Sequence, residues 1–188
     1  MMTDQEIGIS TWSAKLAEQL LAPLGNRWLH TQGVVRTAEH IGQAFDVKTR
    51  ELLVAAAYVH DIGYAPSIQR TGFHPLDGAH YLLSFNQTRL ASLVAYHSEA
   101  PFEAELRSLL PELNHIPREH STLADALTYC DMHTGPTGQK LTFEQRIADI
   151  FQRYPEGHIV NRAIHQALPS YIQAIANVQN LLQSKNML

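Results

Sequence analysis

The chain of 188 residues has little of what marks several classes of protein. It contains one cysteine, Cys130, which excludes an intrachain disulfide framework. Its apolar segment Leu52–Val59 is far shorter than the ~20 residues that span a bilayer. The first residues, Met1–Glu6, carry acid where a secretory signal has basic residues and then an apolar run. We therefore expect a soluble cytoplasmic protein with no membrane partner.

Charge is scarce as well. Charged residues make up 17% of the chain, below the usual ~25%, while 45% of the residues are apolar, which argues against disorder. The formal net charge of -4 leaves no basic surface for a polyanion, so we expect no nucleic-acid polymer as a partner. A domain of this size buries roughly 70% of its unfolded surface. The composition therefore predicts a single domain over residues 1–188.

Apolar residues recur at helical period along almost the whole chain, and strand-like alternation is absent. Thr49, Ser121 and the pair Thr142 and Gln145 have the residue types of helix N-terminal caps. The pattern predicts an all-α, single-domain helical bundle, with a loop over 62–75. The expected helices cover residues 13–24, 28–45, 49–60, 75–85, 88–97, 102–110, 122–130, 143–154 and 158–183.

Histidine is abundant, with 11 residues spread along the chain. His60 and Asp61 follow directly on the apolar segment Leu52–Val59 and precede Gly63. Two adjacent ionisable residues at the end of so apolar a segment cost free energy unless something satisfies them. A divalent cation would do so, because neutral imidazole and carboxylate are good ligands for Zn, Fe, Mn or Co. The chain can turn at a helix end so that both side chains reach one ion.

Four more candidate ligands have a similar position in the pattern. His30, His74, His97 and Asp131 each lie at or near the end of a mostly apolar helical segment. Helix ends in a bundle can converge on one pocket. We therefore group these residues with His60 and Asp61 as a candidate metal site.

In this order, His30, His60-Asp61 and Asp131 resemble the H…HD…D pattern of the HD-domain superfamily of metal-dependent phosphohydrolases. The stretch His60–Gly63 matches the HDIG form of that signature letter for letter. The resemblance covers residues 27–131, the expected metal-binding core. Residues 132–188 are then a C-terminal helical completion of the domain, or a contact in a homo-oligomer.

Two further segments extend the resemblance. His74–Ala79 is similar to the H-P-x-x-G segment of HD-GYP cyclic-dinucleotide phosphodiesterases and to the H-x-x-x-G-A segment of bacterial symmetric dinucleoside-tetraphosphate hydrolases. Tyr96-His97 falls where those branches carry another metal-binding histidine. The resemblance implies one divalent ion held by His30, His60, Asp61 and Asp131, and a second ion held by His74 and His97, with Asp61 bridging. It leaves open one or two ions, of Fe, Mn, Zn, Co, Ni or Mg.

The chain departs from the family pattern in two places. Tyr64 replaces the lysine that often follows HDIG, which removes a cation that could hold a phosphate. The GYP triplet is missing after His97, which argues against cyclic di-GMP as substrate. Charge stabilisation of a phosphoryl group normally needs Lys or Arg, so we expect Arg70 in the broken loop to act beside Asp61 in catalysis. Arg27, one turn before His30, is the second choice.

The function that these features predict is hydrolysis of a phosphate ester of a nucleotide or related small molecule by metal-activated water. A small phosphorylated substrate, with a nucleotide preferred, is then the expected partner. Two alternatives stay open. One is a non-catalytic, metal-containing ligand sensor, which the missing lysine favours. The other is an oxygenase with a di-iron site of the HD type.

Overall fold

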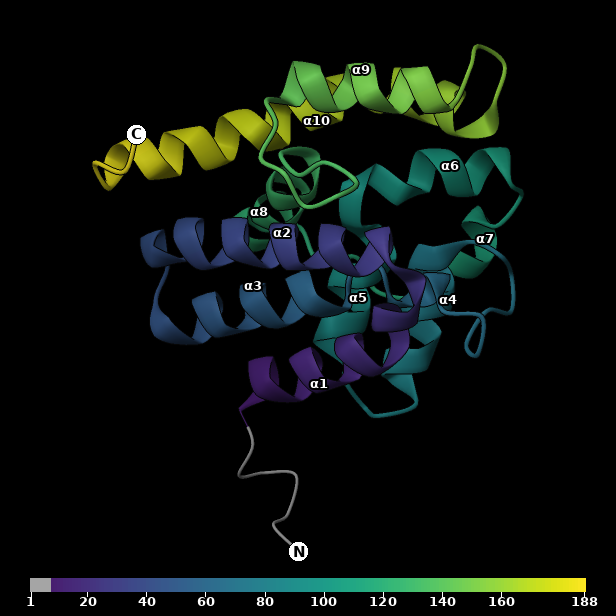
Figure 1. Cartoon of the computed structure of the whole chain (residues 1–188), viewed down its shortest axis with the longest axis horizontal. Coiled ribbons are helices and arrows are strands. Elements are labelled where there is room, and N and C mark those ends of the chain that lie inside the picture. The colour runs from purple at the N-terminus through teal and green to yellow at the C-terminus, as the bar shows by residue number, and fades with distance from the viewer. Residues whose placement is uncertain (1–7) are drawn as a thin grey trace, which may run out of the picture.

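The computed structural model describes residues 8–188, and helices account for most of this part of the chain (Figure 1). The predicted all-α, single-domain fold is confirmed. Within residues 8–188, β pairing is limited to an isolated bridge between Thr134 and Lys140. No helix among these residues is both long and apolar enough to cross a membrane. The α-helices are α1 Ile9–Leu21, α2 Asn26–Ile41, α3 Val47–Val59, α4 His74–Leu83, α5 Thr88–Tyr96, α6 Ala100–Leu106, α7 Leu110–Leu113, α8 Thr122–Met132, α9 Phe143–Arg153 and α10 Ile159–Ser184.

Short 3-10 turns join several of these helices. Two of them bear on the site: Ile62–Tyr64 after α3, and His97–Glu99 after α5. The turn Ile62–Tyr64 packs closely against α4. The predicted loop over 62–75 therefore contains one turn of 3-10 helix and ends as α4 begins at His74.

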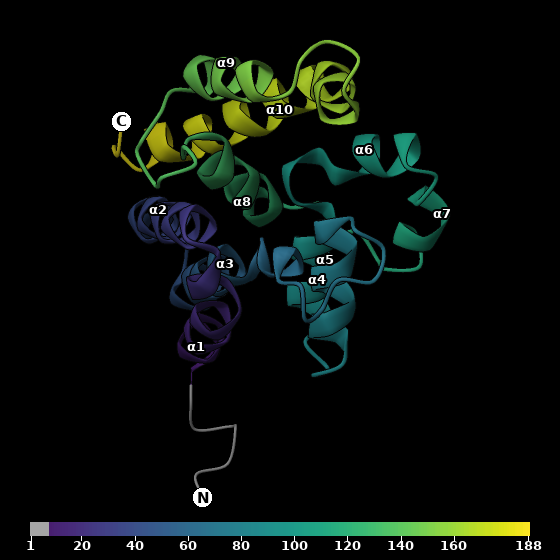
Figure 2. The same ribbon diagram turned by 45° about the vertical axis from the view of Figure 1, so that its right-hand side comes forward.

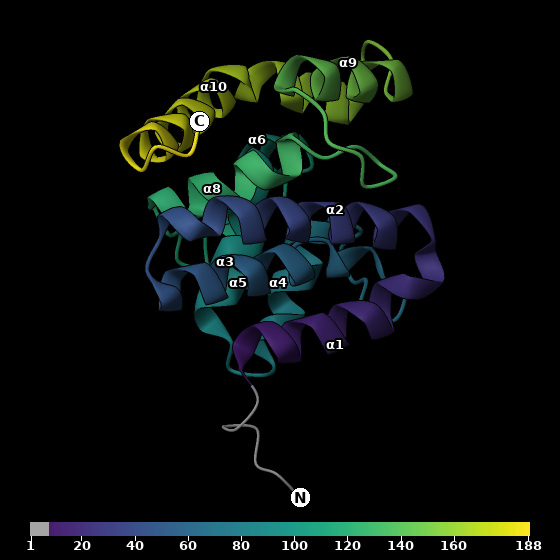
Figure 3. The same cartoon turned by 60° about the vertical axis from the view of Figure 1, so that its left-hand side comes forward.

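Most of the helices form one stack, and a second group of helices packs beside it. α1 packs on α3, α3 packs on α2, and both α2 and α3 contact α8, which in turn supports α10 (Figure 2). α4 and α5 pair beside this stack, and α6 and α7 extend from them. Viewed from the other side, α1, α3 and α2 form rows below α9 and α10 (Figure 3). The main core lies between α1–α5 and α8.

A second, smaller apolar cluster lies where α9 and α10 pack together. Its buried members are Met132, Ile150, Ile164, Ala167 and Tyr171. This cluster joins α9 to the first half of α10, and the two helices form a layer above the α2–α3–α8 group, while Val178 and Leu182 join the second half of α10 to the main core. The cavity at the candidate site lies between these two layers.

Two of the three predicted caps are confirmed. The Ser121 hydroxyl accepts the Ala124 N–H at the start of α8, and Thr142 and Gln145 form a reciprocal capping box at α9. The assignment of Thr49 was wrong. α3 begins earlier, at Val47, because the Asp46 carboxylate accepts the backbone N–H groups of Lys48 and Thr49 at 3.0 and 3.1 Å.

Candidate metal centre

Ends of several helices converge on one point, as the sequence predicts. His30 comes from α2, His60 and Asp61 follow α3, and His74 begins α4. His97 follows α5, and Asp131 lies in the last turn of α8. The structure brings together all six predicted ligands from these five segments.

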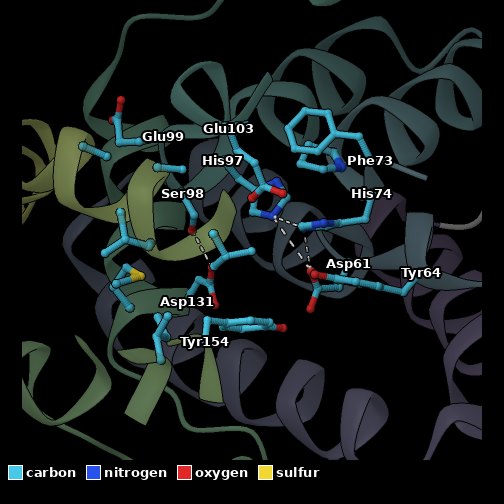
Figure 4. Close-up of a pocket in the computed structure, with 18 of the residues that line it drawn as sticks. Asp61, Tyr64, Phe73, His74, His97, Ser98, Glu99, Glu103, Asp131 and Tyr154 are labelled. Carbon is cyan, nitrogen blue, oxygen red and sulfur yellow. Dashed lines mark hydrogen bonds and ion pairs between the residues drawn. The ribbon is translucent and has the colours of Figure 1, made fainter. Parts of the chain in front are cut away.

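The Asp61 carboxylate lies at the centre of the group. Its Oδ2 atom is 3.3 Å from His60 Nε2 and 3.8 Å from His30 Nε2. Its Oδ1 atom is 3.3 Å from His74 Nε2 and 3.9 Å from His97 Nε2 (Figure 4). Each oxygen of Asp61 therefore faces a different pair of histidines, which suits a carboxylate that bridges two ions.

The six residues divide into two sets of three. His30, His60 and Asp131 form one set, and Asp61, His74 and His97 form the other, with the ligand atoms of each set within 4.8 Å of one another. In the first set, His30 Nε2 is 3.0 Å from Asp131 Oδ1. In the second, His74 Nε2 is 3.3 Å from His97 Nε2. Both sets combine imidazole and carboxylate, the donors that suit divalent transition metals.

Backbone carbonyl groups orient three of the histidine rings. The Nδ1 atoms of His30, His60 and His97 lie 3.0, 2.8 and 2.6 Å from the carbonyl oxygens of Gly135, Ala57 and Val94. A carbonyl oxygen only accepts, so Nδ1 carries the proton and, in a neutral ring, Nε2 presents a lone pair. Metal-binding histidines are oriented by the same kind of hydrogen bond.

The Nε2 atoms of His30 and His60 show whether the site suits a metal ion. Both atoms are fully buried and have no hydrogen-bond partner among the described residues. Both face carboxylate oxygens of Asp61 or Asp131, which, despite burial, raise the pKa of His60, so lone pairs confront lone pairs unless a proton or a metal ion lies between them. An unsatisfied buried polar atom costs about 1–3 kcal/mol, which a cation between these atoms would remove. The residues present fit a divalent metal.

The electrostatics favour a cation in the same place. Burial alone would raise the pKa of Asp61, but the charges of His60 and Arg27 hold this pKa well below its usual range. Burial lowers the pKa of His74 far below the ordinary value and also lowers that of His97, which the charge of His60 lowers further. Asp61 is therefore ionised at neutral pH, while His74 and His97 are neutral and free to act as ligands.

Arg27 occupies the place that was expected for Arg70. Arg27 Nη1 donates to Asp61 Oδ2 at 2.7 Å, and its guanidinium lies 3.9 Å from the centre of the Tyr64 ring. The other face of Tyr64 stacks on His74, with ring centres 4.0 Å apart. Arg70 is exposed on its loop and does not line the cavity at the cluster. Because the loop directs Arg70 outward, we transfer its proposed role to Arg27.

Two arginines of α9 reach the cluster from the other layer. The side chain of Arg146 is almost fully buried, and its Nη2 is 3.6 Å from Asp131 Oδ1. Arg146 and Arg153 also share Asp149, at 3.2 and 2.8 Å. No motif identified them in the sequence. Their only signal was a pair of basic side chains seven residues, or about two turns, apart on an amphipathic helix, which is also typical of a solvated face.

The cluster opens into a cavity of about 250 Å³ between the two layers (Figure 4). Asp61, His74, His97 and Asp131 line it, and so do Arg27, Arg146 and Arg153. Residues beyond the expected core, 27–131, thus form part of the wall. The loop 134–138, which follows α8, orients His30 through the Gly135 carbonyl.

A strained turn next to His97 supports Asp131. Ser98 and Glu99 both have left-handed backbone angles, with φ of 48° and 55°, which cost energy for residues other than glycine. Three contacts hold the turn: Ser98 N–H donates to Thr128 Oγ1 at 3.2 Å, Ser98 Oγ donates to Asp131 Oδ2, and Tyr171 OH donates to the Ser98 carbonyl at 2.5 Å. The sequence carried no sign of this arrangement.

We expect Ser98→Ala to weaken metal binding about tenfold, because the Asp131 carboxylate loses the hydrogen bond that orients it. Competition with a chelator would measure the change. Ser92→Ala is the matched control, since Ser92 also makes a side-chain hydrogen bond to a carbonyl, that of Pro117, but contacts no ligand. Equal metal affinity in the two variants would contradict a positioning role for Ser98.

Fold and site together define an all-α domain with a histidine–aspartate cluster that could hold a divalent metal. A family model described as HD domain matches residues 27–154, more than half of the chain, and the chain belongs to this family. The match includes α9 and ends before α10. No curated protein and no solved structure matches the chain.

Proposed function

We propose that the chain is a metal-dependent phosphohydrolase that cleaves a phosphate ester of a nucleotide or related small molecule. One observation carries the proposal: four of the six candidate ligands, Asp61 among them, line a cavity that guanidinium groups also line. A cluster of this kind attracts an anion once it holds divalent ions, and arginine binds phosphate in a bidentate manner. Membership in the HD-domain family supports a hydrolase-type activity.

The proposed roles follow from the contacts. His30, His60, Asp61 and Asp131 would hold one ion, and Asp61, His74 and His97 the other. A divalent ion at this site supplies Lewis-acid activation of water and of the phosphoryl oxygens at neutral pH. Arg27 uses one N–H for Asp61 and is fixed by Tyr64, so its remaining donors can hold a phosphoryl oxygen in the cavity. Arg146 can do the same from α9.

The direct test combines metal analysis with a substrate panel. Protein purified without chelator or affinity nickel is analysed for metal by elemental mass spectrometry. It is then loaded with Mn, Fe, Co, Ni or Mg and assayed for phosphate release from nucleotides, dinucleotides and generic phosphodiesters. Two equivalents of metal and turnover of a phosphate ester are expected. Failure of every loaded form to cleave any ester would refute the proposal.

Arg27 and Arg70 make a matched pair of variants. We expect Arg27→Ala to lower kcat/KM by about 100-fold, because the group that would stabilise the phosphoryl charge is lost. Arg70→Ala removes the same charge from an exposed loop and should leave kcat/KM within about twofold. The kinetics use the best substrate of the panel. A large loss in Arg70→Ala with none in Arg27→Ala would restore the original assignment.

The two alternatives have their own tests. The ligand sensor was favoured by the missing lysine, but Arg27 places a cation next to Asp61, so the absence of lysine no longer favours it. Thermal stabilisation by a ligand without turnover would revive the sensor. Oxygen consumption by the iron-loaded protein would support the di-iron oxygenase. A cytoplasmic location and a homo-oligomer stay predictions.

A further inference from the structure

The wall of the cavity that α10 contributes is chemically unlike the wall with the metal ligands. Four small or branched apolar residues, Val160, Ala163, Ile164 and Ala167, line the cavity from α10. The last three follow Val160 by three, four and seven residues, and this spacing puts all four on one face of the helix. We call these four residues the α10 stripe. The family match ends at residue 154, so the stripe belongs to a part of this chain that the family model does not describe.

Three polar groups near the stripe already have partners. Tyr171 OH, at the end of the same helix face, donates to the Ser98 carbonyl. Two carboxylates also line the cavity, and each faces an arginine. Glu103 accepts from Arg107 at 2.7 Å, and Glu99 accepts from Arg118 at 3.3 Å. The four side chains of the stripe therefore offer a ligand apolar surface and no hydrogen-bonding group, while Tyr154 and His158, which precede α10, are polar residues that also line the cavity.

The cavity is also small. Its volume of about 250 Å³ lies below the ~300–1,000 Å³ that is usual for pockets of small-molecule ligands. A phosphoryl group at the metal ligands and arginines takes up part of that space. The remainder fits a ring or a short chain, so a dinucleotide would extend out of the cavity. Hydroxyl groups of a sugar placed against the α10 stripe would lose water without gaining partners, which disfavours a sugar phosphate.

We propose that the α10 stripe binds the organic body of the substrate and selects a compact phosphomonoester with an apolar body, of the aryl phosphate class. This inference rests on the proposed function for the phosphoryl end of the site, and it narrows the substrate from a nucleotide or related small molecule to an ester without a sugar. It adds the determinant of specificity, which is the shape and apolar character of the wall made by α10. Ala163 is the position where added side-chain volume would enter the space for that body.

Binding of two phosphonates to the metal-loaded protein tests the proposal without turnover. Phenylphosphonate and methylphosphonate share the head group and differ in the apolar body. We expect calorimetry to give a Kd for phenylphosphonate at least about tenfold lower, because the ring is buried against the α10 stripe. Ala163→Leu should abolish this preference by filling the space, while the Kd for methylphosphonate changes by less than about twofold.

Two further variants guard against a general disturbance of the fold. Ala176→Leu adds the same side chain on α10 at a half-buried position outside this cavity, and it should keep the preference for phenylphosphonate. Ile164→Ala removes apolar surface instead of adding it and should also reduce the preference. Equal affinity of the wild type for both phosphonates, or a preference that survives in both Ala163→Leu and Ile164→Ala, would overturn the proposal.

The substrate assay separates this inference from the proposed function. Phenyl phosphate should be cleaved with a kcat/KM at least about tenfold above that of ribose 5-phosphate. If phenylphosphonate binds with the expected preference but no ester is cleaved, the hydrolase proposal fails and the binding role of the α10 stripe holds. If sugar phosphates or dinucleotides are the better substrates, the hydrolase proposal holds and the inference about the stripe fails.

Discussion

Asp61→Ala is expected to abolish hydrolysis, with a loss of about a thousandfold or more, and to lower the bound metal to less than one ion per chain. The reason is the central position of the carboxylate. Oδ2 faces His60 and His30, while Oδ1 faces His74 and His97, so one truncation removes a ligand from both sets. Elemental analysis and a phosphate-release assay on the same preparation would measure the two effects together.

Asp46→Ala is the matched control for this variant. It also removes a single carboxylate, but one that caps α3 and lies outside both sets of ligands. Loss of such a cap costs about 1 kcal/mol of stability. The control should therefore melt at a lower temperature and keep its full metal content. Full metal content and normal turnover in Asp61→Ala would contradict the bridging role.

The convergence of the six candidate ligands could be predicted because the sequence marks them in two ways. Each is a polar residue at or near the end of an apolar helical segment, and helix ends in a bundle meet at a common point. The order of the residues also resembles a family signature. Neither argument depends on contacts between distant side chains. Most of the helices could also be predicted, because apolar residues recur along them at helical period.

The rest of the site arises from packing that leaves no local signal. Arg27 on α2 and Arg70 in the loop after the motif are both basic residues, and only the packing of α2 and the path of the loop put the first inside and the second outside. Arg146 and Tyr171 come from helices that follow the motif region and join it only through the second layer. At α3, Asp46 and Thr49 are both suitable caps, and the chosen residue depends on where the preceding turn ends.

A second large effect is expected for the glycine of the HDIG motif. A Cβ atom at Gly63 would lie 1.9 Å from the His74 carbonyl oxygen and 2.8 Å from the Gly78 backbone nitrogen. Both neighbours are backbone atoms of α4, so no side chain can rotate away. Gly63→Ala must push the turn Ile62–Tyr64 off α4. We expect it to lower the free energy of unfolding by about 3 kcal/mol or more.

The same displacement should reach the metal site, because Gly63 lies between two parts of the ligand set. Asp61 precedes it by two residues, and the carbonyl it would strike belongs to His74. Moving the turn therefore changes the 3.3 Å separation of Asp61 Oδ1 and His74 Nε2. Metal content should fall together with stability. Denaturant unfolding and elemental analysis would measure these changes.

Gly42→Ala provides the comparison. A Cβ atom there would meet the Arg50 side chain at 3.0 Å, and this flexible, exposed chain can move aside. The backbone of Gly42 is helical, with φ of -58°, so alanine is not strained. The expected change is less than about 1 kcal/mol. If Gly63→Ala unfolded like Gly42→Ala and kept its metal, the close contact between the turn and α4 would not be what requires glycine in the motif. If only Gly63→Ala loses stability and bound metal, the need for glycine at this position is explained by the close approach of two backbone segments that each carry a candidate metal ligand.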